Sequence, residues 1–193
     1  MTASLPAPVA QLLHCARAVL SLHGLGGQRW IRNVPATDAR HGPWLQAQFE
    51  VLDPDFWKAG GPCLYLVTGQ DGALRYVDIS RNGLKHRWRL SPALDAASGE
   101  PLRERQLFHS QCWKHIEAEC KQDSQARFTV HGLGERALIE ALRTLEDPVR
   151  HLAELDEDGE TVTAAIERWI CNRASDSLAR WNVAMTARRA ASR

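Results

Sequence analysis

The stretch LYLVTGQDGALRYVDIS, residues 64–80, contains Tyr65 and Tyr76, the only two tyrosines in a chain of 193 residues. A short apolar run precedes GQDG, whose glycines favour a turn, and a second run rich in strand-forming residues follows it. This pattern predicts a β-hairpin over residues 63–80. Because opposed residues of an antiparallel pair point to the same side of a sheet, we expect both phenols on one face.

Two registers fit this hairpin. A four-residue loop, GQDG, places Tyr65 opposite Tyr76, whereas a two-residue loop formed by Asp71 and Gly72 places Tyr76 opposite Val67. The two registers differ by two residues, so the phenols share a face in both of them.

The composition predicts a folded protein, because 44% of the residues are hydrophobic and 24% are charged. The formal net charge is only +1, so binding of a polyanion would need local clusters of Arg and Lys. We expect no membrane partner, because no stretch approaches the roughly 18 uninterrupted apolar residues of a membrane span and no targeting segment is recognisable. The five cysteines are irregularly spaced and lack a CxxC pair, which favours reduced thiols and a cytoplasmic location.

Apolar periodicity and breaker residues divide the rest of the chain into helices and strands. The predicted helices cover residues 6–22, 82–90, 107–122, 135–146 and 161–174. The predicted strands outside the hairpin cover residues 45–52, 126–130 and 149–155. The glycine-rich segments HGLGGQ (23–28) and HGLGER (131–136) are predicted to be turns at helix boundaries. Together these elements predict an α+β fold.

Several of these segments together resemble the GIY-YIG nuclease family. LYLV and RYVDIS are similar to its two strand motifs, and GLKHRWR is similar to the helix that carries the family's arginine. AIERWI (165–170) is similar to the glutamate helix, and RWNVA (180–184) is similar to the asparagine segment. The resemblance implies a small three-stranded antiparallel sheet flanked by helices, with residues 149–155 as the third strand.

The resemblance also implies a division of the chain. Residues 61–184 would form the GIY-YIG-like core, with a helical insertion at 91–147. Residues 1–60 would form an N-terminal helix and a Trp-rich extension, and residues 185–193 a basic tail.

By the same resemblance, the protein is expected to be an endonuclease that hydrolyses DNA with the help of Mg²⁺ or Mn²⁺. The implied catalytic residues are Tyr65 as general base, Tyr76 as its orienting partner, Arg87 as phosphate clamp, Glu167 as metal ligand and Asn182 as a support for the glutamate helix or a substrate oxygen. The implied substrate-binding residues are Lys85, His86 and Arg89. A module with one site cuts both strands of DNA only as a homodimer or in two successive steps.

Two alternatives remain open at this point. Glu140, in GERALIEALRTLEDP, also lies in a segment similar to the glutamate helix and competes with Glu167 as metal ligand. Cys63 and Asp78 replace the glycines of the two strand motifs. A carboxylate beside a phosphate site either repels the substrate or joins the metal ligands. The alternative to an enzyme is therefore a catalytically degenerate scaffold that binds nucleic acid or another protein.

Overall fold

The computed structural model describes residues 7–102, 107–108, 111–145, 159–173 and 181–182. Its main feature is an antiparallel six-stranded sheet in which β2, β1, β8, β3 and β4 follow one another and β6 pairs with β1. The strands of this sheet are β1 (Arg17–Ile31), β2 (Trp44–Val51), β3 (Cys63–Gly69), β4 (Leu74–Ser80), β6 (Ala93–Asp95) and β8 (Phe128–Gly134). A separate pair consists of β5 (Leu90–Ser91) and β7 (Leu107–Phe108). The predicted α+β class is confirmed, with six strands in the main sheet.

Strands β3 and β4 form the predicted hairpin. Tyr65 lies opposite Asp78 and Val67 lies opposite Tyr76, with an irregularity between Val67 and Thr68. The register in which the two tyrosines face each other directly is therefore wrong, and the alternative that pairs Tyr76 with Val67 is observed. Both phenols lie on the same face, with ring centroids 6.1 Å apart.

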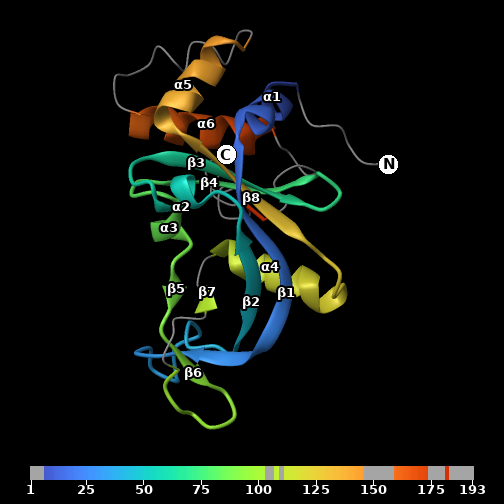
Figure 1. Ribbon diagram of the computed structural model, residues 1–193, viewed down its shortest axis with the longest axis vertical. Helices are drawn as coiled ribbons and strands as arrows, with labels where there is room; N and C mark the ends of the chain where they lie inside the picture. The colour runs from blue at the N-terminus through green and yellow to red at the C-terminus, as the bar shows by residue number, and fades with distance from the viewer. Residues whose placement is uncertain (1–6, 103–106, 109–110, 146–158, 174–180, 183–193) are drawn as a thin grey trace, which may run out of the picture.

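The helices cover both faces of the hairpin (Figure 1). Helices α1, α5 and α6 pack on the face that carries Leu64, Leu66 and Val77, while α3 and α4 pack on the face of the tyrosines. Their bounds are α1 Ala7–Cys15, α2 Pro54–Lys58, α3 Leu84–Arg87, α4 Gln111–Gln122, α5 Glu135–Arg143 and α6 Gly159–Arg173. None of the described helices is both long and apolar enough to cross a membrane.

The prediction for residues 23–28 is wrong, and that for residues 131–136 is right only in the helix boundary, since α5 begins at Glu135 with Gly134 as its N-cap. The N-terminal helix ends at Cys15, and residues 23–28 continue through β1. Residues 131–134 likewise lie inside β8. At position 132 only a glycine fits without a shift of its neighbours, because a Cβ there would lie 2.3 Å from the ring of Phe56. The glycine thus allows α2 to pack closely on the sheet instead of making a turn.

The strand beside the hairpin also differs from the expectation. β8 overlaps the predicted strand 126–130, but it pairs with β3 along its whole length, whereas the resemblance implied a helical insertion over residues 91–147. The predicted strand 149–155 lies outside the described residues. Because β8 pairs with β1 on its other side, the N-terminal part of the chain belongs to the same sheet as the hairpin.

Helix α3 is a single turn rather than the predicted helix over residues 82–90. Gly83 precedes it with φ of 89°, a conformation that favours glycine. A Cβ on Gly83 would lie 2.2 Å from the carbonyl oxygen of Ala59, and the Ser80 hydroxyl donates a hydrogen bond to the Gly83 carbonyl over 2.7 Å. These contacts fix the start of α3 between α2 and the end of β4, and so determine where Arg87 lies.

Candidate functional site

The predicted tyrosines and arginine meet around one carboxylate. The hydroxyls of Tyr65 and Tyr76 donate hydrogen bonds to Asp78 Oδ2 over 2.8 Å and 2.9 Å. Arg87 forms an ion pair with the same oxygen through Nη2 and donates from Nε to the Tyr65 hydroxyl over 3.2 Å. These four residues are called the Asp78 cluster below.

Three residues of the Asp78 cluster are largely buried, and the fourth, Arg87, is exposed to solvent. Tyr65 is fully buried and Tyr76 is 7% exposed, while the Asp78 side chain is 13% exposed. The Arg87 side chain is 40% exposed. Its N–H groups other than the two already described meet no acceptor among the residues that the structure describes. A ligand can therefore reach the cluster through the guanidinium.

The environment keeps both phenols protonated. Burial raises the pKa of Tyr65 well above its ordinary value, and the charge of Asp78 raises it further, while Arg87 opposes the increase. Burial and Asp78 also raise the pKa of Tyr76. Burial by itself lowers the pKa of Arg87, but its contacts with Tyr65 and Asp78 outweigh that effect and raise it. The cluster thus consists of two neutral hydroxyl donors and one permanent cation around an acceptor oxygen.

Glu167 lies within electrostatic range of this cluster. Glu167 is 8% exposed and projects from α6, which packs against β4 and β3. Burial raises the pKa of Glu167 from 4.5 to about 7, Asp78 raises it as well, and Arg87 and Arg168 oppose this increase. A largely buried carboxyl is a group that a hard cation such as Mg²⁺ can bind.

The competing glutamate lies in a different environment. The side chain of Glu140 is 59% exposed on α5 and pairs with Arg136 over 3.0 Å, one helical turn away. A surface pair of this kind contributes little and needs no further ligand. The arrangement therefore favours Glu167 over Glu140 as the carboxyl within electrostatic range of Asp78 and Arg87.

Asn182 contacts the hairpin rather than the Asp78 cluster. Its amide oxygen accepts a hydrogen bond from Val77 N over 3.1 Å, and its amide nitrogen donates to Val77 O over 2.6 Å. The neighbouring Trp181 N donates to Arg75 O over 3.2 Å. Residues 181–182 thereby cover the free edge of β4 and hold the backbone between Tyr76 and Asp78.

The predicted substrate-binding residues surround Arg87 on the surface. Lys85 and His86 on α3, and Arg89 just beyond it, are all exposed. Among the described residues, none of the three forms a hydrogen bond or ion pair with the Asp78 cluster, and their side chains add cationic groups next to Arg87 in the chain.

Sequence reasoning identified Asp78 only as a departure from a motif. Its central role depends on the register, which places it directly opposite Tyr65 and two residues from Tyr76 on one face. Cys63, at the other replaced glycine, is 3% exposed, and burial raises its pKa to about 11. Cys63 is therefore a packing residue and not a nucleophile.

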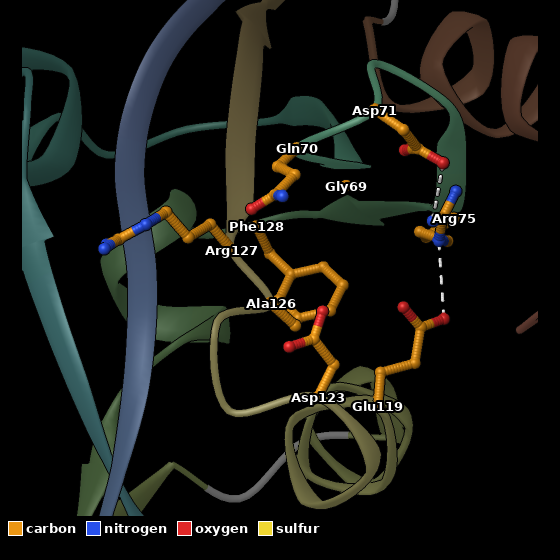
Figure 2. Close-up of a pocket in the computed structure, with 9 residues that line it drawn as sticks. All are labelled: Gly69, Gln70, Asp71, Arg75, Glu119, Asp123, Ala126, Arg127 and Phe128. Carbon is orange, nitrogen blue, oxygen red and sulfur yellow. Dashed lines mark hydrogen bonds and ion pairs between the residues drawn. The ribbon is translucent and has the colours of Figure 1, made fainter.

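A second polar site lies at the loop end of the hairpin. A cavity of about 220 Å³ is lined by Phe128 and by charged side chains of the hairpin and α4. Figure 2 shows Arg75 between Asp71 and Glu119 there. Arg75 pairs with these two carboxylates over 3.0 Å and 3.3 Å. Two carboxylates therefore pair with one guanidinium, and their combined negative charge exceeds its positive charge. This cavity is thus less suited to an anionic ligand than the Asp78 cluster is.

Comparison with known proteins adds no assignment. No family model matches the chain, and neither the curated proteins nor the solved structures contain a match. Within the described residues, no three His, Cys, Asp or Glu side chains are grouped as a ready-made metal site. The functional argument therefore depends on the geometry of the site itself.

Proposed function

We propose that the protein is a metal-dependent endonuclease that hydrolyses DNA phosphodiester bonds with a GIY-YIG-type site. The observation that carries this proposal is the convergence of Tyr65, Tyr76 and Arg87 from β3, β4 and α3, with Glu167 from α6 in electrostatic range. The strands β4, β3 and β8 would serve as the three-stranded core of the module, extended by β1, β2 and β6.

Each residue has a chemical role in this proposal. Arg87 binds the scissile phosphate, because a planar guanidinium matches two phosphate oxygens and its exposed N–H groups face solvent. Glu167 would hold Mg²⁺ or Mn²⁺, which supplies positive charge beside the phosphate when bound. Lys85, His86 and Arg89 would contact the DNA backbone.

Tyr65 is protonated at rest, so it would first lose its hydroxyl proton to solvent, and the resulting phenolate would then accept the proton of the attacking water. The bond to the leaving oxygen would break, and that oxygen would take a proton from solvent. Tyr76 would orient the water or the phosphate. Arg87 donates to the Tyr65 hydroxyl and so stabilises the phenolate that this role requires. Asp78 and burial have the opposite effect on the pKa of Tyr65. The reaction therefore requires the Asp78 carboxylate to move away from the phenol.

A plasmid-nicking assay with Mg²⁺, Mn²⁺ or EDTA tests the proposal. Nicking should need the metal, and Arg87→Ala or Glu167→Ala should slow it by about 100-fold or more, the usual effect of losing one preorganised group. Glu140→Ala is the matched control and should remain active. Nicking that persists in EDTA, or that is lost in Glu140→Ala but retained in Glu167→Ala, contradicts the assignment.

The second candidate function is a nucleic-acid-binding or protein-interaction scaffold without catalysis. The observation that favours it is the ion pair between Asp78 and Arg87, which neutralises the phosphate clamp. Under this alternative, the protein would bind a fluorescent DNA duplex without cutting it. This result should hold with Mg²⁺ and with Mn²⁺, from about pH 6 to about pH 9.

A further inference from the structure

The donors of the Asp78 cluster surround a single oxygen atom. Asp78 Oδ2 receives hydrogen bonds from the hydroxyls of Tyr65 and Tyr76 and from Arg87 Nη2. Two hydroxyl donors and a guanidinium that converge on one anionic oxygen form a cradle for an oxyanion. A phosphate group presents such oxygens, and guanidinium recognises it with the same geometry as a carboxylate.

We propose that Asp78 fills, from within the chain, an oxyanion site whose external ligand is a phosphate group, and that the ligand binds when the Asp78 carboxylate leaves. The identification of a DNA phosphate as the natural ligand rests on the proposed function. The existence of the anion site depends only on the geometry of the Asp78 cluster.

The contacts of the Asp78 side chain allow its carboxylate to move out of the cluster. Within the described part of the chain, its other carboxylate oxygen, Oδ1, accepts a hydrogen bond only from the N–H of the next residue, Ile79, over 2.8 Å. This contact is local and does not tie the side chain to another element. The Arg87 side chain is 40% exposed and remains fixed by Tyr65 through Nε. An incoming phosphate can therefore contact the guanidinium from solvent before it replaces the carboxylate.

The ion pair at the other end of the hairpin shows why this cluster is more than a structural contact. Arg75 pairs with two carboxylates, Asp71 and Glu119, and no tyrosine takes part. At that end of the hairpin, two carboxylates pair with a single cation. In the Asp78 cluster three donor groups share one carboxylate oxygen, so removing that carboxylate leaves a cationic cradle without its anion.

Inorganic phosphate is the probe that tests the inference. Isothermal titration calorimetry should compare the wild-type protein with Asp78→Ala and Asp78→Asn. Asp78→Ala should bind phosphate at least about tenfold more tightly than the wild type, because a competing charge-assisted acceptor is removed. Asp78→Asn keeps the shape of the side chain and removes its charge, so it should also bind more tightly even if the alanine variant does not fold.

Two further variants make the test specific. The gain should disappear in Asp78→Ala/Arg87→Gln, because the cradle has lost its cation. Asp71→Ala removes a carboxylate that pairs with the arginine at the other end of the same hairpin, and it should not change phosphate affinity. The inference is overturned if a folded Asp78→Ala or Asp78→Asn protein binds phosphate no better than the wild type, or if the gain survives without Arg87.

A short DNA duplex forms a separate arm of this experiment. If Asp78→Ala gains affinity for phosphate but neither binds the duplex more tightly nor nicks a plasmid, the anion site stands and the nuclease proposal fails. If the wild-type protein nicks DNA and Asp78→Ala changes neither phosphate binding nor nicking, the nuclease proposal stands and the occupied oxyanion site is refuted.

Discussion

Replacing Glu167 with glutamine should stabilise the protein above pH 7 and leave its stability near pH 4.5 almost unchanged. Burial raises the pKa of this carboxyl from 4.5 to about 7 in the folded state. The unfolded chain therefore loses the proton first, and the free energy of unfolding falls as the pH rises from 4.5 to about 7. At roughly 1.36 kcal/mol per pH unit, this interval corresponds to a loss of about 3 kcal/mol.

Urea denaturation between pH 4.5 and pH 8, followed by tryptophan fluorescence, measures this effect. The free energy of unfolding of Glu167→Gln should exceed that of the wild type by about 3 kcal/mol at pH 8, and the difference should vanish near pH 4.5. Glu140→Gln is the matched control. Glu140 is exposed and pairs with the exposed Arg136, so its replacement should change stability by about 0.5 kcal/mol or less at every pH.

Added Mg²⁺ extends the same experiment to the proposed metal site. At pH 8 the ion should stabilise the wild-type protein by mass action and have no such effect on Glu167→Gln. A difference between wild type and Glu167→Gln that is constant from pH 4.5 to pH 8 would refute the buried environment of Glu167. A pH-dependent difference without any Mg²⁺ effect would support the environment and reject the metal role.

Two further predictions concern the segments that position the site. Gly83→Ala should destabilise the protein by about 2 kcal/mol or more in urea denaturation, because the new Cβ meets a backbone oxygen at 2.2 Å and φ is 89°. Gly60→Ala is its control and should have little effect, since nothing lies within 4 Å of a Cβ there. Asn182→Ala should cost about 1–3 kcal/mol, because both hydrogen bonds to Val77 are lost. The exposed Asn82 provides the control Asn82→Ala, which should change the unfolding midpoint little.

Local sequence signals were sufficient for elements whose determinants lie close together in the chain. The apolar runs on either side of GQDG predicted β3 and β4, and helical periodicity predicted α5 and α6 within a few residues. The segment 17–22 was assigned to a helix because its apolar spacing also fits one. In the structure it pairs with β2 on one side and β8 on the other, and these partners come from distant parts of the chain. Tertiary pairing thus overrides the local pattern.

The same distinction applies to the candidate site. Tyr65, Tyr76 and Arg87 could be brought together from the sequence, because a hairpin and the helical turn directly after it place them within one short segment. Glu167 comes from a helix roughly 80 residues further along, so its distance from Arg87 could be anticipated only through the family resemblance. The structure adds the burial and the electrostatic environment that distinguish it from Glu140.

The chemical role of Asp78 depends on a register that the loop sequence left open. With the four-residue loop, Asp78 would lie opposite Cys63, and Tyr65 would face Tyr76 instead. In the observed register Asp78 lies directly opposite Tyr65, so its carboxylate can accept from both hydroxyls and from Arg87 at once. A shift of two residues in the hairpin thus decides whether this carboxylate only repels a phosphate at a distance or occupies the position of one of its oxygens.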